Sequence, residues 1–516
     1  MHVSTAPIVP DRARAIVIGA GIAGLSTSLR LACAGMQVSL LERHAHAGGK
    51  IRTVPSDAGP VDAGPTVLTM RHVFDDLFAA AGTTLEDHVT LIPQDILARH
   101  FWPDGSSLDL YADMRRSLRA IAGFAGPKAA QEFASFNART RNLFSAFDKP
   151  MMQAAKPRLA ELVMHVLRQP RLIPAMDPTR SLSQSLARQF SDPRLAQLFG
   201  RYATYVGGNP QFSPALLSLI WRAEASGIWV VQGGMHRLAT AVAELAQQKG
   251  VALHTDCHVE EILSRHGHAS GVRTTAGDII EADAIVYAGD PRALATGDLG
   301  PDLSEVAAQT RSLPRSLSAR VYSFAAEVSG PELCHHNVFF AADPASEFTD
   351  LAEGRIPRDP TLYLCAEDRG QTSSSPRVER FEIIANAPAD DTDIPPQELS
   401  QWHHQIMQRM ADSGVTFTPT PQLQNLTTPQ QFARLFPQSL GALYGQTPHG
   451  MTAALKRPTA RTQIPGLYLA GGGTHPGAGV PMATLSARHA AEAILHDLTS
   501  TSMYRPMATH GGTSTG

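Results

Sequence analysis

The sequence has few cysteines and little net charge. Its 516 residues include only 4 cysteines, at positions 33, 257, 334 and 365, and none of them forms a CxxC motif. This scarcity excludes a disulfide scaffold and a zinc site built from cysteines, and it is typical of a reducing compartment. The 44 Lys and Arg nearly balance the 47 Asp and Glu. We therefore expect no nucleic-acid partner, because proteins that bind nucleic acids normally present a basic face.

Long apolar runs are also missing. The most apolar window, 15–35, is interrupted by Arg30 and by regularly placed glycines, whereas a membrane-spanning helix needs about 20 predominantly apolar residues. Residues 1–13 lack the apolar core of a signal peptide and are expected to be disordered, as is the polar tail 501–516. We expect a protein that is soluble or bound to a membrane surface. With 43% hydrophobic residues, it can bury a substantial core.

The amino-terminal region has the pattern of a βαβ unit. The apolar run 15–18 predicts a buried parallel strand, and residues 25–34 have a helical pattern. A second apolar run, 38–41, ends in Glu42 and Arg43. The order strand, glycine turn, helix, strand and acid is that of a dinucleotide-binding unit.

Each glycine of the turn between the first strand and the helix has a physical role. Gly19 allows the tight turn, Gly21 lets backbone amides approach a pyrophosphate, and Gly24 permits close packing of helix and strand. Glu42 follows Gly19 by 23 residues, close to the usual spacing for an acid that binds a ribose hydroxyl. The region therefore predicts a dinucleotide site.

A second glycine pair favours a flavin over a nicotinamide cofactor. Gly48 and Gly49, followed by Lys50, come shortly after the predicted ribose acid, and the segment VDAGPT follows at 61–66. This arrangement resembles the extended flavin motif of the amine-oxidase and carotenoid-desaturase superfamily. A nicotinamide dehydrogenase has no need of it, so we expect FAD.

Three separated stretches have α/β character. Residues 14–90, 226–300 and 456–500 are expected to form one split FAD-binding domain, and the last contains a further glycine-rich loop at 469–473. The expected fold class is α/β, a Rossmann-like FAD domain interrupted by a mixed α+β substrate domain.

The two intervening stretches are expected to form the substrate domain. Residues 91–225 have a sequence pattern typical of helices, and residues 301–455 have patterns of both strands and helices. Within the second stretch, 341–360 and 385–398 are rich in Pro, Asp and Ala and are predicted to be loops.

One segment of the first insert is basic and amphipathic. Residues 149–176 contain a single acid, Glu161, and interleaved Met and Leu. Such a segment can lie on an anionic membrane surface, or it can be an ordinary surface helix packed on its own domain. Its basic residues are Lys149, Lys156, Arg158, Arg168 and Arg171.

Three motifs in the same order resemble the bacterial phytoene-desaturase-like carotenoid desaturases along essentially the whole chain. They are AIVIGAGIAGLSTSLRLACAG, WVVQGGMHRLATAVAELAQQKG and GLYLAGGGTHPGAGVPMATLSARHAA, of which THPGAGVPM is the most specific. Lys50 and the segment 198–207 narrow the resemblance to the 1-hydroxycarotenoid 3,4-desaturases, that is, the hydroxyneurosporene or methoxyneurosporene dehydrogenases of purple photosynthetic bacteria.

The resemblance implies removal of two hydrogens across C3–C4 of an acyclic C40 carotenoid that already carries a hydroxyl at C1. It further implies reoxidation of FAD by oxygen or a quinone, and a cytoplasmic protein attached peripherally to the inner, photosynthetic membrane. The residues that it assigns to FAD are Gly19, Gly21, Gly24, Glu42, Arg43, Gly48, Gly49, Lys50, Val259, Gly472, Gly473, Pro481 and Met482.

Three further residues are weaker candidates. His475 is the only titratable residue of the last glycine-rich loop. It could act as a catalytic base, or it could stabilise the turn through a hydrogen bond. Arg201 and Tyr202 could meet a polar end group of the substrate or serve an ordinary surface or domain contact. No general base is assigned, and no metal is expected.

Other functions are compatible with the same fold. A phytoene desaturase would share the cofactor but act on a colourless substrate. A flavin amine oxidase would place an aromatic pair before the flavin, and no such pair is obvious among the 4 Trp and 9 Tyr. A non-enzymatic prenyl-lipid escort would lack a working flavin site, whereas all the flavin segments are intact here.

Overall fold

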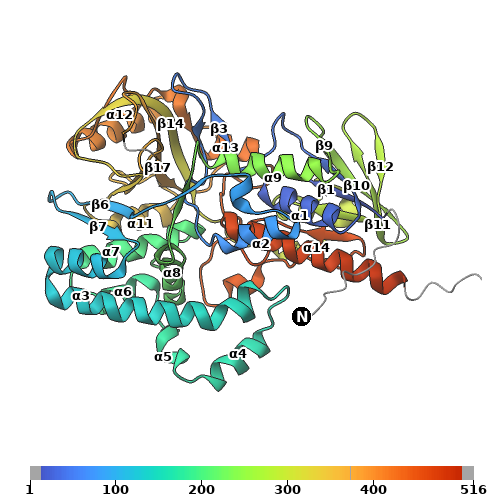
Figure 1. Ribbon diagram of the computed structural model, residues 1–516, viewed down its shortest axis with the longest axis horizontal. Coiled ribbons are helices and arrows are strands. Elements are labelled where there is room, and N and C mark those ends of the chain that lie inside the picture. The colour runs from blue at the N-terminus through green and yellow to red at the C-terminus, as the bar shows by residue number, and fades with distance from the viewer. Residues whose placement is uncertain (1–12, 372–373, 503–516) are drawn as a thin grey trace, which may run out of the picture.

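The computed structural model describes residues 13–371 and 374–502. The chain builds a parallel sheet, an eight-stranded sheet and a layer of helices beneath them (Figure 1). The segments 1–13 and 501–516, predicted to be disordered, lie almost entirely outside the described residues. In the part of the chain that the structure describes, no helix has the length and apolar character needed to cross a bilayer.

The parallel sheet has five strands in the order β20-β13-β1-β2-β9, and every neighbouring pair is parallel. The strands come from three distant parts of the chain, all within the stretches that show α/β character in the sequence. They are β1 (Arg14–Ile18), β2 (Gln37–Leu41), β9 (Ala252–His254), β13 (Ala284–Tyr287) and β20 (Leu467–Leu469).

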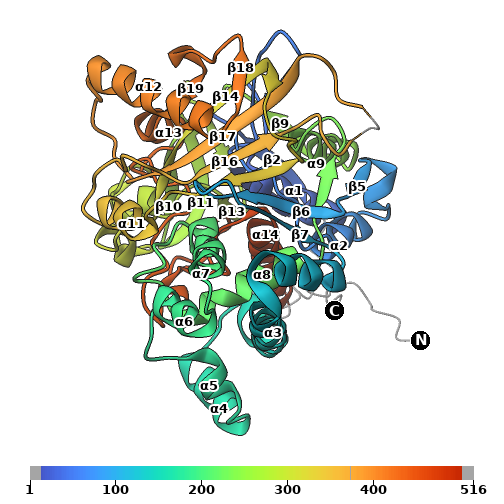
Figure 2. The same ribbon diagram turned by 90° about the vertical axis from the view of Figure 1, so that its left-hand side faces the viewer.

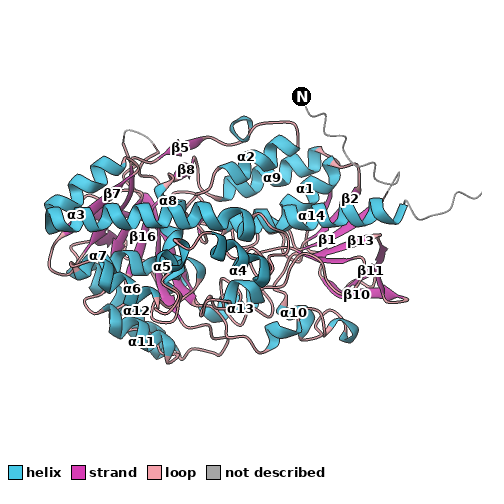
Figure 3. Ribbon diagram, turned by 90° about the horizontal axis from the view of Figure 1, so that it is seen from below, coloured by secondary structure: helices cyan, strands magenta, loops and turns pink. Residues whose placement is uncertain are grey.

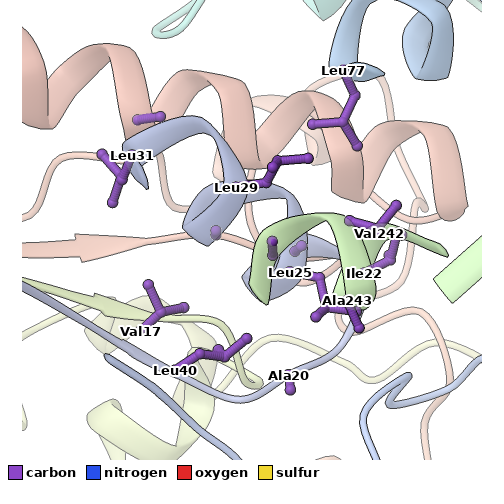
Figure 4. Packing of buried hydrophobic residues seen from close by; sticks show 14 of the residues in the cluster. Val17, Ala20, Ile22, Leu25, Leu29, Leu31, Leu40, Leu77, Val242 and Ala243 are labelled. Atoms are coloured by element: carbon purple, nitrogen blue, oxygen red, sulfur yellow. The ribbon is translucent and has the colours of Figure 1, made fainter. Parts of the chain in front are cut away.

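The alternation of side chains along these strands places a different layer on each face. Val17 and Leu40 pack against helices α1 (Ile22–Cys33) and α9 (His236–Gln248), as Figure 4 shows. The neighbouring side chain of Ile16 packs on the other face, against an antiparallel sheet. That sheet consists of β10 (Val259–Arg265), β11 (His268–Thr274) and β12 (Ile279–Glu281). Helix α14 (Val480–Ser502) also packs on α1.

The eight-stranded sheet has the order β18-β14-β17-β16-β15-β6-β7, and β19 pairs with β14. Helix α12 (Pro396–Asp412) covers one face through Trp402 and Ile406, which pack against Phe381 and its neighbours. The strands are β6 (Ile96–Phe101), β7 (Ser107–Tyr111), β14 (Ser318–Ser329), β15 (His336–Phe339), β16 (Leu362–Ala366), β17 (Glu379–Ala387), β18 (Thr416–Thr418) and β19 (Leu426–Thr427).

The helical layer comes from the first insert and is seen from below in Figure 3. Its longest helix bends at Gly126, whose φ of 90° is non-helical and which precedes Pro127. Helices α4 and α5 extend away from the rest of the molecule (Figure 2). The helices are α3 (Met114–Phe147), α4 (Leu159–Arg168), α5 (Leu172–Met176), α6 (Leu182–Gln189), α7 (Pro193–Gly200) and α8 (Ile220–Ala225).

Two segments differ from the expectations. Residues 91–111, expected to be helical, form β5 (Leu91–Pro93) and the hairpin β6–β7, because β6 pairs with the distant strand β15. Residues 341–360, predicted to be a loop, contain α11 (Pro344–Ala352), which begins where the Asp343 carboxylate accepts a hydrogen bond from the Ala345 amide at 2.9 Å.

The remaining elements connect these layers. They are β3 (Thr53–Val54), β4 (Val61–Asp62), α2 (His72–Ala80), β8 (Trp229–Val231), α10 (Arg292–Ala295) and α13 (Pro429–Leu435).

Candidate flavin and substrate site

A cavity of about 800 Å³ is lined by residues of the parallel sheet, the eight-stranded sheet and the helical layer. Most residues that the sequence assigned to FAD line it, although they come from distant segments. They are Gly19, Gly21, Glu42, Arg43, Gly48, Gly49, Lys50, Val259, Gly472, Gly473, Pro481 and Met482. Arg201 also lines the cavity, whereas Gly24, Tyr202 and His475 are not part of its lining.

The glycine turn after β1 brings backbone amides to the cavity. Gly19 has a φ of 97°, and Gly21 precedes α1 in an extended conformation with no side chain capping the helix. The amides of the first turn therefore remain available to an anion, and the helix dipole favours one there. Gly24 lies outside the cavity because it packs helix α1 against the glycine turn at Gly19. A Cβ at Gly24 would lie 1.9 Å from the carbonyl oxygen of Gly19.

The second glycine pair lies against this turn. Gly48 bridges to Gly21, and a Cβ on Gly49 would lie 2.9 Å from the Gly21 Cα. A Cβ on Gly21 itself would meet nothing closer than 3.8 Å. Side chains at 48 and 49 would thus disturb the chain, whereas one at Gly21 would mainly intrude on whatever lies in the cavity.

Glu42 holds the end of β2 beside the same turn. Its carboxylate accepts hydrogen bonds from the Ala20 amide at 2.7 Å and the His44 amide at 2.9 Å. The acid is buried and lines the cavity next to Cys257 and Val259. This position suits the ribose of a dinucleotide, with the backbone around Val259 beside it.

A second helix start faces the cavity from the carboxy-terminal side. The loop 471–473 leads to Pro481 and Met482, which lie in the first turn of α14. A Cβ at Gly473 would lie 2.6 Å from the ring of Pro291. The loop therefore needs glycine to pass this close to its neighbour, and it leaves another backbone wall for a flat ligand.

The Lys50 side chain contacts the segment 436–443, which is distant in the sequence. Its ammonium donates a hydrogen bond to the Leu443 carbonyl at 2.5 Å and lies 5.4 Å from the centre of the Phe436 ring. Burial lowers the pKa of Lys50 to about 8, although Asp290 opposes this shift. The residue can therefore contribute a positive charge to the cavity at neutral pH.

His475 is held by a contact outside the cavity lining. Its Nε2 shares a hydrogen bond of 2.8 Å with the carbonyl oxygen of Ala154, and burial lowers the pKa of its imidazole to about 4. This placement corresponds to the expected alternative, a hydrogen bond that stabilises the loop. It gives no support to a role as catalytic base, since His475 is not part of the cavity lining.

Tyr202 lies behind a residue of the cavity lining. Its hydroxyl donates a hydrogen bond to the carboxylate of Glu224 at 2.7 Å, and Glu224 itself lines the cavity. The sequence did not single out Glu224, because it lies 22 positions after Tyr202 and in a different helix.

Glu382 is a further cavity residue that the sequence reasoning missed. It is fully buried, and neither of its carboxylate oxygens has a hydrogen-bond partner among the described residues. Burial, with Glu367 and Asp62 nearby, raises the pKa of Glu382 well above its usual value. An acid between the apolar residues Phe381 and Ile383 of the strand ERFEIIANA was the signal that could have revealed it.

The site fits FAD in its chemistry. Two helix starts and two glycine loops offer backbone amides, and a buried acid stands at the expected ribose position. The cavity continues beyond these groups between apolar side chains, which leaves room for a substrate beside the cofactor.

Comparison with known proteins decides the family. Residues 22–495 match the model for flavin-containing amine oxidoreductases. The chain belongs to this family. Its cofactor is FAD, as the sequence predicted, and the predicted Rossmann-like α/β fold is confirmed.

Three relatives that match this flavin-dependent protein over nearly its whole length share one name. It is 52% identical to "Hydroxyneurosporene desaturase" of Cereibacter sphaeroides over 96% of this chain and 99% of that one. The protein of the same name from Rhodobacter capsulatus is 49% identical over 93% of this chain and 97% of the other. That of Rubrivivax gelatinosus is 45% identical over 97% of both chains. The predicted membership of the carotenoid desaturases is thus confirmed.

Solved structures share the fold at low sequence identity. A redesigned putrescine oxidase aligns with a TM-score of 0.59 at 13% identity, covering 95% of this chain and 99% of that one. Cyclohexylamine oxidase from Brevibacterium oxydans aligns with a TM-score of 0.56 at 17% identity, covering 95% and 100%. These likenesses concern the fold alone.

Proposed function

We propose that this flavin enzyme removes two hydrogens across C3–C4 of an acyclic 1-hydroxycarotenoid such as 1-hydroxyneurosporene. The observation that carries the proposal is the 45% to 52% identity, over nearly the whole chain, to three proteins named hydroxyneurosporene desaturase. The cavity supports it, because its lining includes both the glycine loops and a set of apolar side chains.

The chain's own contribution is binding, orientation and exclusion of water. FAD, when bound, would supply the acceptor for a hydride from an allylic carbon of the polyene, while the neighbouring carbon releases the second hydrogen as a proton. The glycine loops and the two helix starts hold the cofactor. The wall opposite consists largely of apolar side chains, which suit a hydrocarbon chain. Among them are Met70, Phe144, Met152, Leu219, Ile220 and Ala223.

The proposal is tested with purified, FAD-loaded protein and two carotenoids in separate liposome samples. We expect 1-hydroxyneurosporene to give a red-shifted product that is two hydrogens lighter, and phytoene to remain unchanged. Conversion of phytoene alone would move the enzyme to an earlier desaturation. Failure of both carotenoids, with turnover of a primary amine, would favour an amine oxidase. A protein that cannot hold FAD would favour a lipid escort.

We further propose that α4 and α5 attach the protein to the cytoplasmic face of the inner membrane, from which a lipid-soluble substrate would enter. Leu159 is 57% and Leu167 59% exposed, and Val163, Met164 and Ile173 are also exposed. Exposed basic residues flank this apolar surface, as is typical of helices at anionic bilayers.

The chain links this surface directly to the cavity. Met152, which lines the cavity, lies just before α4, and the His489 ring shares a hydrogen bond of 3.1 Å with its carbonyl oxygen. Only a short segment of chain separates Met152 in the cavity wall from α4. A carotenoid leaving the bilayer at α4 would therefore meet the cavity wall close to this helix. Oxygen or a membrane quinone would then reoxidise the flavin, and an anaerobic assay with added quinone distinguishes them.

Flotation with vesicles containing anionic lipid tests the membrane contact. We expect the paired substitution Leu159→Gln and Leu167→Gln to abolish flotation, and Arg158→Glu with Arg168→Glu to weaken it in a salt-dependent way. Ile279→Gln is the matched control, because Ile279 is also 59% exposed but lies on β12 in the FAD half. Flotation equal to that of the unchanged protein in both paired variants would remove α4 from the proposal.

A further inference from the structure

A charged and polar cluster interrupts the apolar wall of the cavity. Arg201 and Tyr205 lie in the 3₁₀ helix Arg201–Val206, and Glu224 lies in α8. The Arg201 guanidinium donates a hydrogen bond to the Tyr205 hydroxyl at 2.8 Å, and that hydroxyl donates to the Glu224 carboxylate at 3.0 Å. All three residues line the cavity.

Within this cluster, Arg201 has hydrogen-bonding capacity to spare. A guanidinium carries five N–H donors. Its one hydrogen bond among the described residues is the one to Tyr205, and its Nε has no partner there. Glu224, in contrast, accepts from both Tyr202 and Tyr205. Arg201 is therefore the cavity-facing group of this cluster best able to donate to a ligand.

The cluster is costly for a site that takes only hydrocarbons. Arg201 is 7% exposed and Glu224 is 3% exposed, and burying charged groups costs free energy unless they are paired and hydrogen-bonded. A polyene without oxygen offers no acceptor to Arg201. The neighbouring lining residues Val206, Leu219, Ile220 and Ala223 would by themselves suit such a polyene.

We propose that Arg201, oriented by Tyr205 and Glu224, donates a hydrogen bond to the oxygen on C1 of the carotenoid and so selects oxygenated end groups. The inference rests on the proposed function and names the residue that recognises its substrate. Three bonds of about 1.5 Å separate this oxygen from C3, so it lies within about 5 Å of the reacting carbons. Its receptor must therefore line the same cavity that holds the flavin, as Arg201 does.

Because Arg201 only donates hydrogen bonds, the proposal predicts which oxygenated end groups the enzyme accepts. Arginine donates and does not accept, so it serves a hydroxyl oxygen and a methyl-ether oxygen alike. A contact made instead by the Glu224 carboxylate would need a hydroxyl hydrogen and would reject the ether. The two kinds of oxygenated end group therefore identify the contacting residue.

Kinetics with three substrates test the proposal, namely 1-hydroxyneurosporene, its 1-methoxy ether and neurosporene without oxygen. We expect the unchanged enzyme to prefer both oxygenated carotenoids in kcat/KM by about 10- to 100-fold, the value of a hydrogen bond to a charged group. In Arg201→Met we expect this ratio to fall to about 1, mainly through a higher KM. In Tyr205→Phe the ratio should fall part of the way, since Arg201 loses its orienting partner.

Arg320→Met is the matched control. Arg320 is also buried, at 2% exposure, but it lies over the Trp402 ring on the other face of β14 and does not line the cavity. Loss of this arginine can lower stability but should leave the substrate ratio unchanged. A structural role for Arg201 would affect all three substrates equally, whereas recognition affects only the oxygenated pair.

The outcomes separate this inference from the proposed function. Equal conversion of all three carotenoids by the unchanged enzyme, or an undiminished preference in flavin-loaded Arg201→Met, would overturn the role of Arg201 and leave the desaturase standing. Conversion of no carotenoid would overturn both. If Arg201→Met does not fold, the unchanged enzyme decides: conversion of the ether supports the arginine donor, and rejection of the ether refutes it.

Discussion

The parallel-sheet half and the half built on the eight-stranded sheet form their parts of the cavity in different ways. Around Gly21 and the loop 471–473, the cavity wall is backbone, shaped by glycines that pass close to one another. Around Arg201 in the helical layer and Glu382 in the eight-stranded sheet, buried polar side chains from distant elements interrupt an apolar wall. A site made of backbone tolerates few changes of shape, whereas a site made of side chains is tuned residue by residue.

The largest effect is expected in the backbone half, for Gly24→Val. Its Cβ would lie 1.9 Å from the Gly19 carbonyl oxygen, a distance that forces helix α1 away from the turn. We expect a loss of more than about 4 kcal/mol in the free energy of unfolding, or no soluble protein. Denaturant unfolding followed by circular dichroism measures it, and near-normal stability would contradict the assigned packing.

Gly21→Val should separate cofactor binding from folding. Its Cβ has no contact closer than 3.8 Å within the chain and its backbone conformation suits any residue, so the fold should survive. The side chain would occupy the approach to the diphosphate, and we expect FAD affinity to fall by at least about 100-fold. Flavin absorbance after gel filtration measures this; a fully loaded yellow variant would show the site to be misplaced.

The side-chain half should carry a dependence of stability on pH. Burial raises the pKa of Glu347 from 4.5 to about 7, although the Thr361 hydroxyl donates to it at 2.7 Å. The folded chain thus holds this proton more tightly than the unfolded chain. The stabilisation is complete below pH 4.5 and is lost as the pH rises through 7, a loss of about 3 kcal/mol by pH 8.

The substitution Glu347→Gln should remove this component. We expect the difference in unfolding free energy between pH 5 and pH 8 to shrink by an amount on the order of the same 3 kcal/mol. Asp350→Asn, on the same helix α11, is a suitable control, because Asp350 already pairs with Arg355 at 2.7 Å near the surface. An unchanged pH profile in Glu347→Gln would place the dependence elsewhere.

The smallest effect is expected at the start of α11. Asp343→Ala removes the carboxylate that accepts from the Ala345 amide at 2.9 Å, and loss of such a cap costs about 1 kcal/mol. Asp343→Asn should retain most of the stability, since its amide oxygen can still accept. Equal unfolding midpoints for all three proteins would show that the cap contributes nothing.

The same contrast explains what the sequence could predict. The βαβ unit and the loops at 48–50 and 471–473 are local motifs, and the structure brings them to one cavity. The strands over 91–111 were missed because β5 pairs with the distant strand β8, and β6 pairs with β15, more than 200 positions along the chain. Arg201 was a candidate, but its link through Tyr205 to Glu224 depends on how a 3₁₀ helix and α8 meet, which no local pattern records.

The order of strands in the parallel sheet has a consequence for synthesis of the protein. The first strand, β1, lies at the centre of the sheet, whereas the last, β20, forms its edge, and α14 covers α1. The nascent chain therefore exposes an unfinished sheet until β20 and α14 have left the ribosome. A chain truncated before β20 would lack the loop 471–473 as well as the cover of α1. Retention of FAD thus reports that synthesis has passed β20 and the loop 471–473.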